Sequence, residues 1–172
     1  MSDADAIALA LLAQRCAVGA VMLAHGINHI IGGGKIAGTA RWFESLGMKP
    51  GKLHAWLASL TEVGAGALLV LGFLTPLAAA GVVGVIVVAW ITNHMKKGFF
   101  IFRPGEGWEY VMTLTILGFT IGTVGPGRWS IDEAADLMDL AGASGLLITA
   151  VGGIGSALAL LAVFWRRDLS AS

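Results

Sequence analysis

The chain has 172 residues, of which 56% are hydrophobic and only 13% are charged, and its formal net charge is zero. A soluble domain carries about a quarter charged residues, so this composition argues against a water-soluble protein and indicates a membrane protein. Cys16 is the only cysteine, which excludes an internal disulfide, a CxxC redox pair and a cysteine-ligated cluster.

Five apolar stretches follow one another along the chain, and each is long enough to cross a bilayer as a helix. We place them at about 6–31, 53–73, 76–94, 107–125 and 142–165. About 20 apolar residues span the hydrocarbon core, where only helices and closed barrels satisfy their backbone hydrogen bonds. The runs are continuous rather than alternating, so we expect an all-α, polytopic membrane helix bundle that forms a single transmembrane domain over 1–172. The acidic start of the chain indicates no cleaved signal peptide.

The connections between these stretches carry further signals. The link 74–76 ends in proline and is so short that the second and third helices must be antiparallel neighbours. Apolar residues recur at roughly helical spacing over 42–48, which predicts a short helix in the headgroup region. The segment 130–140 has a similar pattern, and Ser130 with Glu133 three residues later predicts a capping box at its start.

Positive charge is distributed very unevenly between the two sides of a five-span arrangement. The side formed by the odd-numbered loops and the C-terminus carries Lys35, Arg41, Lys49, Lys52, Lys96, Lys97, Arg103, Arg166 and Arg167. Arg128 is the one basic residue predicted for the opposite side, where acidic residues dominate. Short loops rich in Lys and Arg stay in the cytoplasm. We therefore predict a multi-pass protein of the bacterial plasma membrane, with its N-terminus outside and its C-terminus in the cytoplasm.

Ionisable side chains inside spanning helices are energetically costly, usually face the interior of a bundle, and so mark candidate functional sites. Four consecutive helices each offer one, mostly in the cytoplasmic half. Glu62 and His94 are the candidate catalytic residues. The candidate cofactor-binding residues are Arg15, His25, His29, Trp90, Glu109 and Tyr110.

Glu62 is the most informative of these residues. It lies about 13 Å along its helix at 1.5 Å per residue, close to the middle of the membrane. A short carboxylate cannot reach water from there, so it is either paired or protonated. His25 and His29 are four residues apart and share one helical face. We expect Arg15 either to act as a countercharge toward Glu62 or to extend outward to lipid phosphates.

Several of the other candidates lie near helix ends, where an interfacial position explains them equally well. His29, His94 and Glu109 are open to both interpretations, and His54 is expected to be interfacial.

A quinone head group fits the predicted pocket, because it needs hydrogen-bond partners and a proton donor or acceptor beneath an apolar groove for its tail. Histidine titrates near neutral pH and can transfer protons. Haem is a weaker hypothesis, since His25 or His29 with His94 is the only candidate ligand pair. No tight ligand cluster predicts a metal site, and no nucleic-acid partner is expected.

An ordered set of short segments resembles the DoxX family of small bacterial membrane proteins. The resemblance begins at Gln14-Arg15 and ends at Asp132. Its segments are His25-Gly26, Gly34-Lys35, Phe43-Glu44-Ser45-Leu46-Gly47, Glu62, Leu71-Gly72-Phe73-Leu74-Thr75-Pro76-Leu77-Ala78, His94, Lys97-Gly98-Phe99-Phe100, Glu109-Tyr110 and Gly125-Pro126-Gly127-Arg128-Trp129-Ser130-Ile131-Asp132.

The resemblance implies a four-helix membrane bundle and, less directly, redox work. The related DoxD group includes membrane subunits of a thiosulfate:quinone oxidoreductase, and other DoxX-like proteins are associated with oxidative-stress complexes that contain superoxide dismutase and a sulfurtransferase. The fifth stretch, 142–165, lies beyond the usual end of the family. It could cover the bundle, form a homo-oligomer interface or bind a partner.

Three functions follow as hypotheses. The first is a quinone-interacting subunit of a membrane redox system, an oxidoreductase component. The second is a non-catalytic scaffold that docks soluble redox enzymes on its basic cytoplasmic loops. The third is a transporter of a small solute or lipid, which ranks last because the spans show no inverted repeat.

Overall fold

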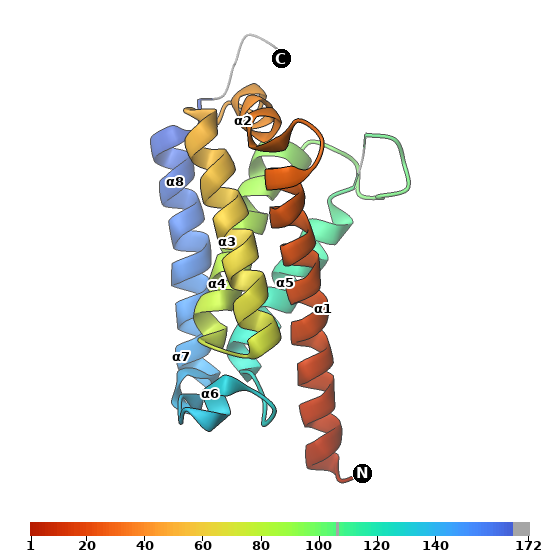
Figure 1. Ribbon diagram of the computed structural model, residues 1–172, viewed down its shortest axis with the longest axis vertical. Helices are drawn as coiled ribbons and strands as arrows, with labels where there is room; N and C mark the ends of the chain where they lie inside the picture. Colours follow the sequence, from red (N-terminus) through yellow and green to blue (C-terminus); the bar gives the residue numbers. More distant parts are fainter. Residues whose placement is uncertain (106, 167–172) are drawn as a thin grey trace.

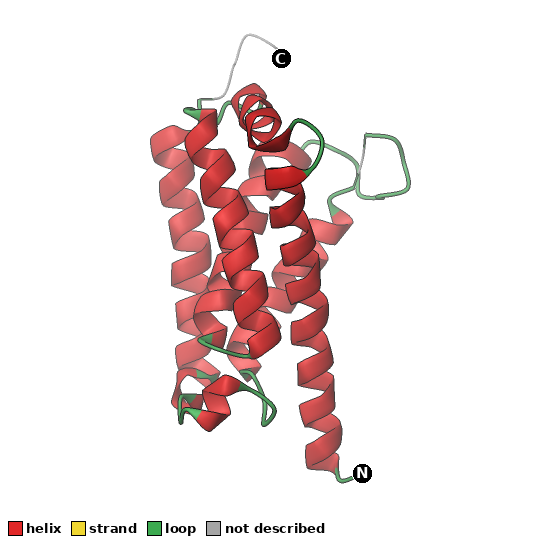
Figure 2. Ribbon diagram, in the orientation of Figure 1, coloured by secondary structure: helices red, strands yellow, loops and turns green. Residues whose placement is uncertain are grey.

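A computed structural model describes residues 1–105 and 107–166 of the chain, which hold helices and no β-strand (Figures 1 and 2). The elements are α1 (Asp3–Ile31), α2 (Lys35–Ser45), α3 (Gly51–Leu71), α4 (Thr75–Ala89), η1 (Trp90–His94), α5 (Glu109–Val124), α6 (Ile131–Ala134), η2 (Met138–Leu140), α7 (Gly142–Leu147), η3 (Ile148–Gly155) and α8 (Ser156–Phe164). η1 and η3 are π-helical, and η2 is a short 3₁₀ turn. The predicted all-α fold class is confirmed.

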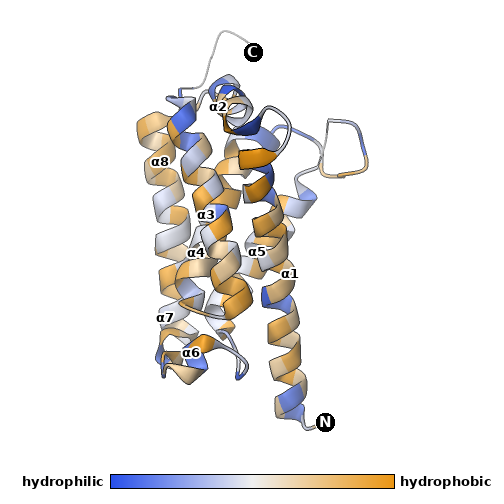
Figure 3. Ribbon diagram, viewed as in Figure 1, coloured by the Kyte–Doolittle hydropathy of each residue, from blue (hydrophilic) through white to orange (hydrophobic). Residues whose placement is uncertain are grey.

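The protein is a multi-pass membrane protein. Four helical rods are long and apolar enough to cross a bilayer, namely Asp3–Ile31, Gly51–Leu71, Thr75–His94 and Gly142–Phe164. α5 is a shorter apolar helix of 16 residues, and it packs against α4 inside the bundle. Apolar residues cover the middle of the rods, and polar residues collect toward their ends (Figure 3). These five rods begin and end within three residues of the predicted stretches.

The connections divide between the two ends of the bundle. α2, the segment 95–105 and the end of α8 lie at one end, which we call the basic end (Figure 1). The N-terminus and α6 lie at the other end (Figure 1). The loop residues predicted to form the basic side therefore share one end of the bundle, apart from Arg167, which lies outside the described residues.

Two connecting segments differ from the expectation. α2 begins earlier than predicted, at Lys35, and lies across the basic end (Figure 1). The segment 130–140 does not form one helix. Ser130 Oγ accepts a hydrogen bond from the amide of Glu133 at 3.1 Å, but α6 has only four residues. Asp136 has a φ of 57°, a left-handed conformation that interrupts the helix.

Glycine permits the closest helix crossings. At the crossing of α1 and α3, a Cβ on Gly19 would lie 2.7 Å from the carbonyl oxygen of Gly66, and a Cβ on Gly66 would meet Gly19 at the same distance. α5 crosses the rod Gly142–Phe164, the fifth rod in chain order, in the same way: Gly122 lies against Gly145 and Thr149. In lipid the helices gain no hydrophobic drive to associate, so such backbone approach supplies the packing contacts.

The end of α8 is tied to the loop between α2 and α3. Trp165 Nε1 donates to the carbonyl oxygen of Leu46 at 2.9 Å, and the amide of Arg166 donates to the carbonyl of Gly47 at 2.8 Å. Met48, which is completely buried, forms an isolated β-bridge with Trp165. These contacts fix the fifth rod at the basic end of the bundle.

Candidate ligand-binding cavity

A cavity of about 560 Å³ extends from the basic end along α4. Residues of α1, α3, α4, η1, α5, η3 and α8 form its wall, and residues of α2 close its end. Its volume is within the range of small-molecule sites, about 300–1,000 Å³. Most of its lining is apolar. Two groups of polar side chains lie in contact within it, and His25, His54, Thr61, Thr92 and Ser156 line it separately.

The first polar group is the pair Glu62 and His29. α1 and α3 approach closely at Gly26, where a Cβ would lie 2.8 Å from the carbonyl oxygen of Ser59 and 3.0 Å from Glu62 Cβ. This crossing brings the last turn of α1 over Glu62, whose Oε2 lies 3.0 Å from His29 Nδ1. The ring N–H does not point along this line, so the contact is electrostatic rather than a directed hydrogen bond. Glu62 is 5% exposed, and a carboxylate at this depth requires such a partner.

The second polar group consists of Asn93, His94 and Tyr110. The π-helical turn η1 closes its backbone hydrogen bond over five residues instead of four, and the wider turn places the adjacent Asn93 and His94 both on the cavity wall. His94 Nε2 lies 2.9 Å from the Tyr110 hydroxyl and 3.0 Å from Asn93 Nδ2. Tyr110 and Glu62 line the same cavity, so the two groups face one shared space.

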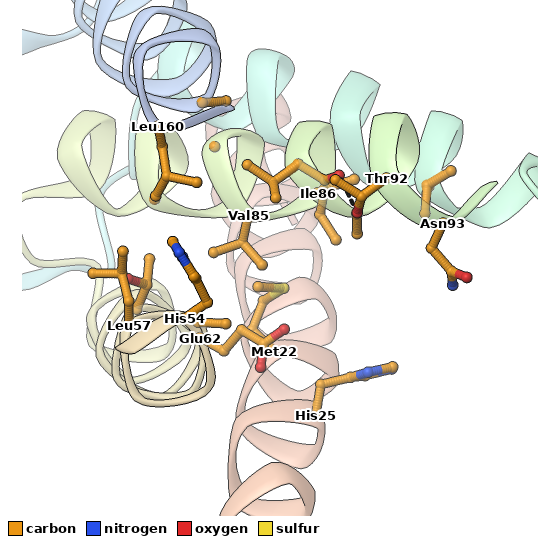
Figure 4. Close-up of a pocket in the computed structure, with 18 of the residues that line it drawn as sticks. Met22, His25, His54, Leu57, Glu62, Val85, Ile86, Thr92, Asn93 and Leu160 are labelled. Atoms are coloured by element: carbon orange, nitrogen blue, oxygen red, sulfur yellow. Dashed lines mark hydrogen bonds between the residues drawn. The ribbon is translucent and has the colours of Figure 1, made fainter. Parts of the chain in front are cut away.

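The remaining part of the cavity is apolar and reaches the lipid-facing surface. Figure 4 shows Leu57 of α3 and Leu160 of α8 on one side of the cavity, away from His25 and Asn93 on the other. Leu57 and Leu77 are 43% and 53% exposed, so this side is not sealed within the protein. The wall here includes small residues of α4 and η3, namely Ala80, Gly81, Gly84 and Gly152.

The structure brings together most of the residues that the sequence singled out. Those that line the cavity are His25, His29, Glu62, His94 and Tyr110. Trp90 and Glu109 lie outside the lining. Trp90 stacks on Trp108, with ring centroids 5.8 Å apart. Glu109 Oε1 accepts a hydrogen bond from the amide of Ile101 at 3.0 Å, so this carboxylate holds the loop between η1 and α5.

Arg15 also lies outside the cavity, which corrects the expectation that it faces Glu62 or lipid. Its side chain is 1% exposed and donates hydrogen bonds to backbone carbonyl oxygens, those of Leu69 at 2.8 Å, Pro126 at 2.9 Å and Trp129 at 2.7 Å. Carbonyls at the end of a helix have no partner within the helix. Arg15 satisfies them and so joins α1 to the end of α3 and to the segment after α5.

Asp132 completes the polar contacts at this end of the bundle. Its carboxylate is 1% exposed and accepts hydrogen bonds from the amides of Leu74 at 2.7 Å and Thr75 at 2.9 Å. These amides begin α4, where an acidic side chain is also favoured by the helix dipole. Asp132 therefore caps α4 from the segment that follows α5.

His54 lines the cavity and is only 2% exposed, so its expected interfacial position is wrong. Its ring packs edge-on against Phe164, with centroids 5.1 Å apart. His54 Nε2 is buried and has no hydrogen-bond partner among residues 1–105 and 107–166. His54 and Glu62 are eight residues apart, a spacing that places both on one helical stripe, and this signal could have identified His54 from the sequence.

No group of three His, Cys, Asp or Glu side chains in the described part of the chain could hold a metal ion. What the cavity offers instead is two acid–base groups from four helical elements, beside apolar surface that lipid can reach. The fold and the cavity thus define a multi-pass helical membrane protein with a candidate site for an amphipathic ligand.

Comparison with protein families identifies the class of this protein more closely. The sequence model of the DoxX family matches residues 10–95, half of the chain, and the protein belongs to this family. Searches of curated proteins and of solved structures found no match. The matched region contains Glu62, His29 and His94 but ends before Tyr110 and the fifth rod.

Proposed function

We propose that the protein binds a quinone in this cavity and serves as the quinone-interacting subunit of a membrane redox system. The observation that carries the proposal is the pairing of Glu62 with His29, and of His94 with Tyr110, on the wall of one largely apolar cavity. A quinone ring has two oxygens on opposite edges, and each takes up one proton when two electrons reduce the ring to a quinol. Two separate acid–base groups match that requirement.

The apolar part of the cavity supports the same proposal, because membrane quinones carry long apolar tails. With the head group beside Glu62 and Tyr110, the tail would lie along α4 toward Leu160 and leave the protein between α3 and α8 (Figure 4). A ligand dissolved in the bilayer could then enter sideways without crossing water.

The first test is quinone extraction from the protein purified in mild detergent, with analysis by mass spectrometry. Glu62→Gln removes the charge from the buried pair, and Glu109→Gln is the matched control because it makes the same change outside the cavity. A hydrogen bond to a charged group contributes about 1.5–3 kcal/mol, so Glu62→Gln should lower quinone affinity by about ten- to a hundredfold. Wild-type protein without quinone, or equal retention by both variants, would refute the proposal.

The second test concerns the tail. Leu160→Trp should obstruct the apolar part of the cavity, while Leu158→Trp changes a lipid-exposed position on the same helix that does not line it. Leu160→Trp should weaken binding of a quinone with a long isoprenoid tail and spare the tail-less ring analogue. Equal effects of the two variants on both ligands would show that the tail lies elsewhere.

A soluble redox partner would exchange electrons with the bound ligand, and the basic end offers its docking surface. Six of the basic residues at this end lie in α2, in the loops and in the first turn of α3. They are Lys35, Arg41, Lys49, Lys52, Lys96 and Lys97. The positive-inside rule predicts that this end lies in the cytoplasm. In a Cys16→Ser background, a membrane-impermeant maleimide should label Asp139→Cys in intact cells and spare Ser45→Cys. The reverse pattern would invert the orientation and exclude a cytoplasmic partner.

A further inference from the structure

The hydrogen-bond chain that leads into the cavity begins at Lys97. Its Nζ lies 2.8 Å from Asn93 Oδ1. A lysine ammonium has hydrogens to donate and no lone pair to accept with, so the atom facing it must be the amide oxygen. The amide nitrogen of Asn93 therefore faces the other way, toward His94.

The orientation of Asn93 decides the state of His94. Asn93 Nδ2 carries two hydrogens and lies 3.0 Å from His94 Nε2, so Nε2 must act as an acceptor. The hydrogen of the neutral imidazole is then on Nδ1, which is buried and has no hydrogen-bond partner in the described part of the chain. Lys97 thus fixes the tautomer of His94 through Asn93.

The tautomer of His94 in turn orients the Tyr110 hydroxyl. The hydroxyl oxygen lies 2.9 Å from Nε2, and since Nε2 is an acceptor, Tyr110 must be the donor in this bond. Its single hydrogen is committed to His94, and the oxygen can present only lone pairs to a ligand. On the other wall the Glu62 carboxylate, paired with His29, is also an acceptor.

We infer that the cavity is built to accept hydrogen bonds from a ligand with hydroxyl groups, so that it binds the quinol form of its ligand in preference to the quinone. The inference rests on the proposed function, because it selects between the two forms of the same head group. A quinone carbonyl can only accept hydrogen bonds and so cannot bond to the Tyr110 oxygen, whereas a quinol hydroxyl can donate a hydrogen bond to it. His94 Nε2 then stands behind Tyr110 as the base toward which the proton of a bound quinol is directed.

The binding test compares one ring in two forms on the full-length protein in lipid nanodiscs without oxygen. The probes are a short-chain ubiquinol and its dimethyl ether, which keeps the shape but cannot donate. Wild type should bind the quinol at least about tenfold more tightly, the effect of one net hydrogen bond or more. Tyr110→Phe should lose about tenfold of this preference and keep only the part that Glu62 supplies. Thr115→Val is the matched control, since it removes a hydroxyl of the same helix that bonds to the Val111 carbonyl outside the cavity lining.

Equal binding of the two probes by wild type, or a preference that Tyr110→Phe leaves undiminished, overturns the inference. Binding of neither probe overturns the proposed function instead, and a second measurement then decides the hydrogen-bond assignment on its own. Nitrogen-15 NMR of histidine-labelled protein, with His94→Gln to identify the signal among the four histidines, should show Nε2 without a hydrogen. In Lys97→Met a larger fraction of His94 should carry its hydrogen on Nε2, because the side-chain amide of Asn93 is then free to turn over. A hydrogen on Nε2 in wild type would refute the assignment of donors and acceptors from Lys97 through Asn93 and His94 to Tyr110.

Discussion

Replacing Arg15 by methionine should destabilise the bundle strongly, because it removes the side-chain donors from a buried cluster of carbonyl oxygens. The three short bonds, at 2.7, 2.8 and 2.9 Å, go to carbonyls of α3 and of the segment after α5. Interhelical hydrogen bonds in membrane proteins contribute about 0.6 kcal/mol on average and about 1.7 kcal/mol at most. Three such bonds predict a loss of about 2–5 kcal/mol in the free energy of unfolding.

The assay is unfolding by SDS in mixed micelles, followed by tryptophan fluorescence. Arg15→Lys keeps the charge but has a compact ammonium that cannot reach all three carbonyls, so it should lose less than Arg15→Met. Gln14→Met is the control, one residue away on the same helix. If Arg15→Met unfolds within about 0.5 kcal/mol of this control, the structural role assigned to Arg15 is refuted. Folded Arg15→Lys should also retain quinone, because Arg15 does not line the cavity.

Four further outcomes are expected, three in the same assay and the last by hydrogen exchange. Asp132→Ala removes the cap of α4 and should cost about 1–2 kcal/mol, and an unchanged midpoint would contradict the capping role. Gly66→Ala should cost about 1–3 kcal/mol, because its Cβ would meet the backbone of Gly19. Gly64→Ala should be neutral or stabilise by up to about 1 kcal/mol, since a Cβ there meets nothing within 4 Å, and equal effects of the two glycine variants would exclude the close crossing. Trp165→Phe removes the bond to the α2–α3 loop and should speed hydrogen exchange over 46–49 before the rest of the bundle, so unchanged exchange there would argue against the tie.

The helical rods follow from hydropathy because lipid leaves the backbone few alternatives. A carboxylate in the middle of the membrane must find a partner, so the environment of Glu62 could also be anticipated, and His29 proved to be that partner. The arrangement of the loops at the basic end likewise follows from counting spans.

The position of Arg15 could not be derived in this way. Its acceptors are backbone carbonyls more than 50 residues away in the chain, and carbonyls leave no trace in the side-chain pattern. Trp90 was misplaced for a different reason: it begins the wider turn η1, whose register an ordinary helical wheel cannot show. Glu109 lies in α5, where its carboxylate accepts from the amide of Ile101 in the preceding loop, a backbone contact that the side-chain pattern does not reveal. His54 was judged by its distance from the helix end, although its spacing from Glu62 indicated a buried face.

The region shared with the family ends at residue 95, while part of the cavity wall comes from α5, η3 and α8. The pair Glu62 and His29 therefore lies inside the matched region, while Ser156 and Leu160 line the cavity from beyond it. Substitutions at positions such as Ser156 and Leu160 would change the shape of the cavity while the pair Glu62 and His29 stays in place.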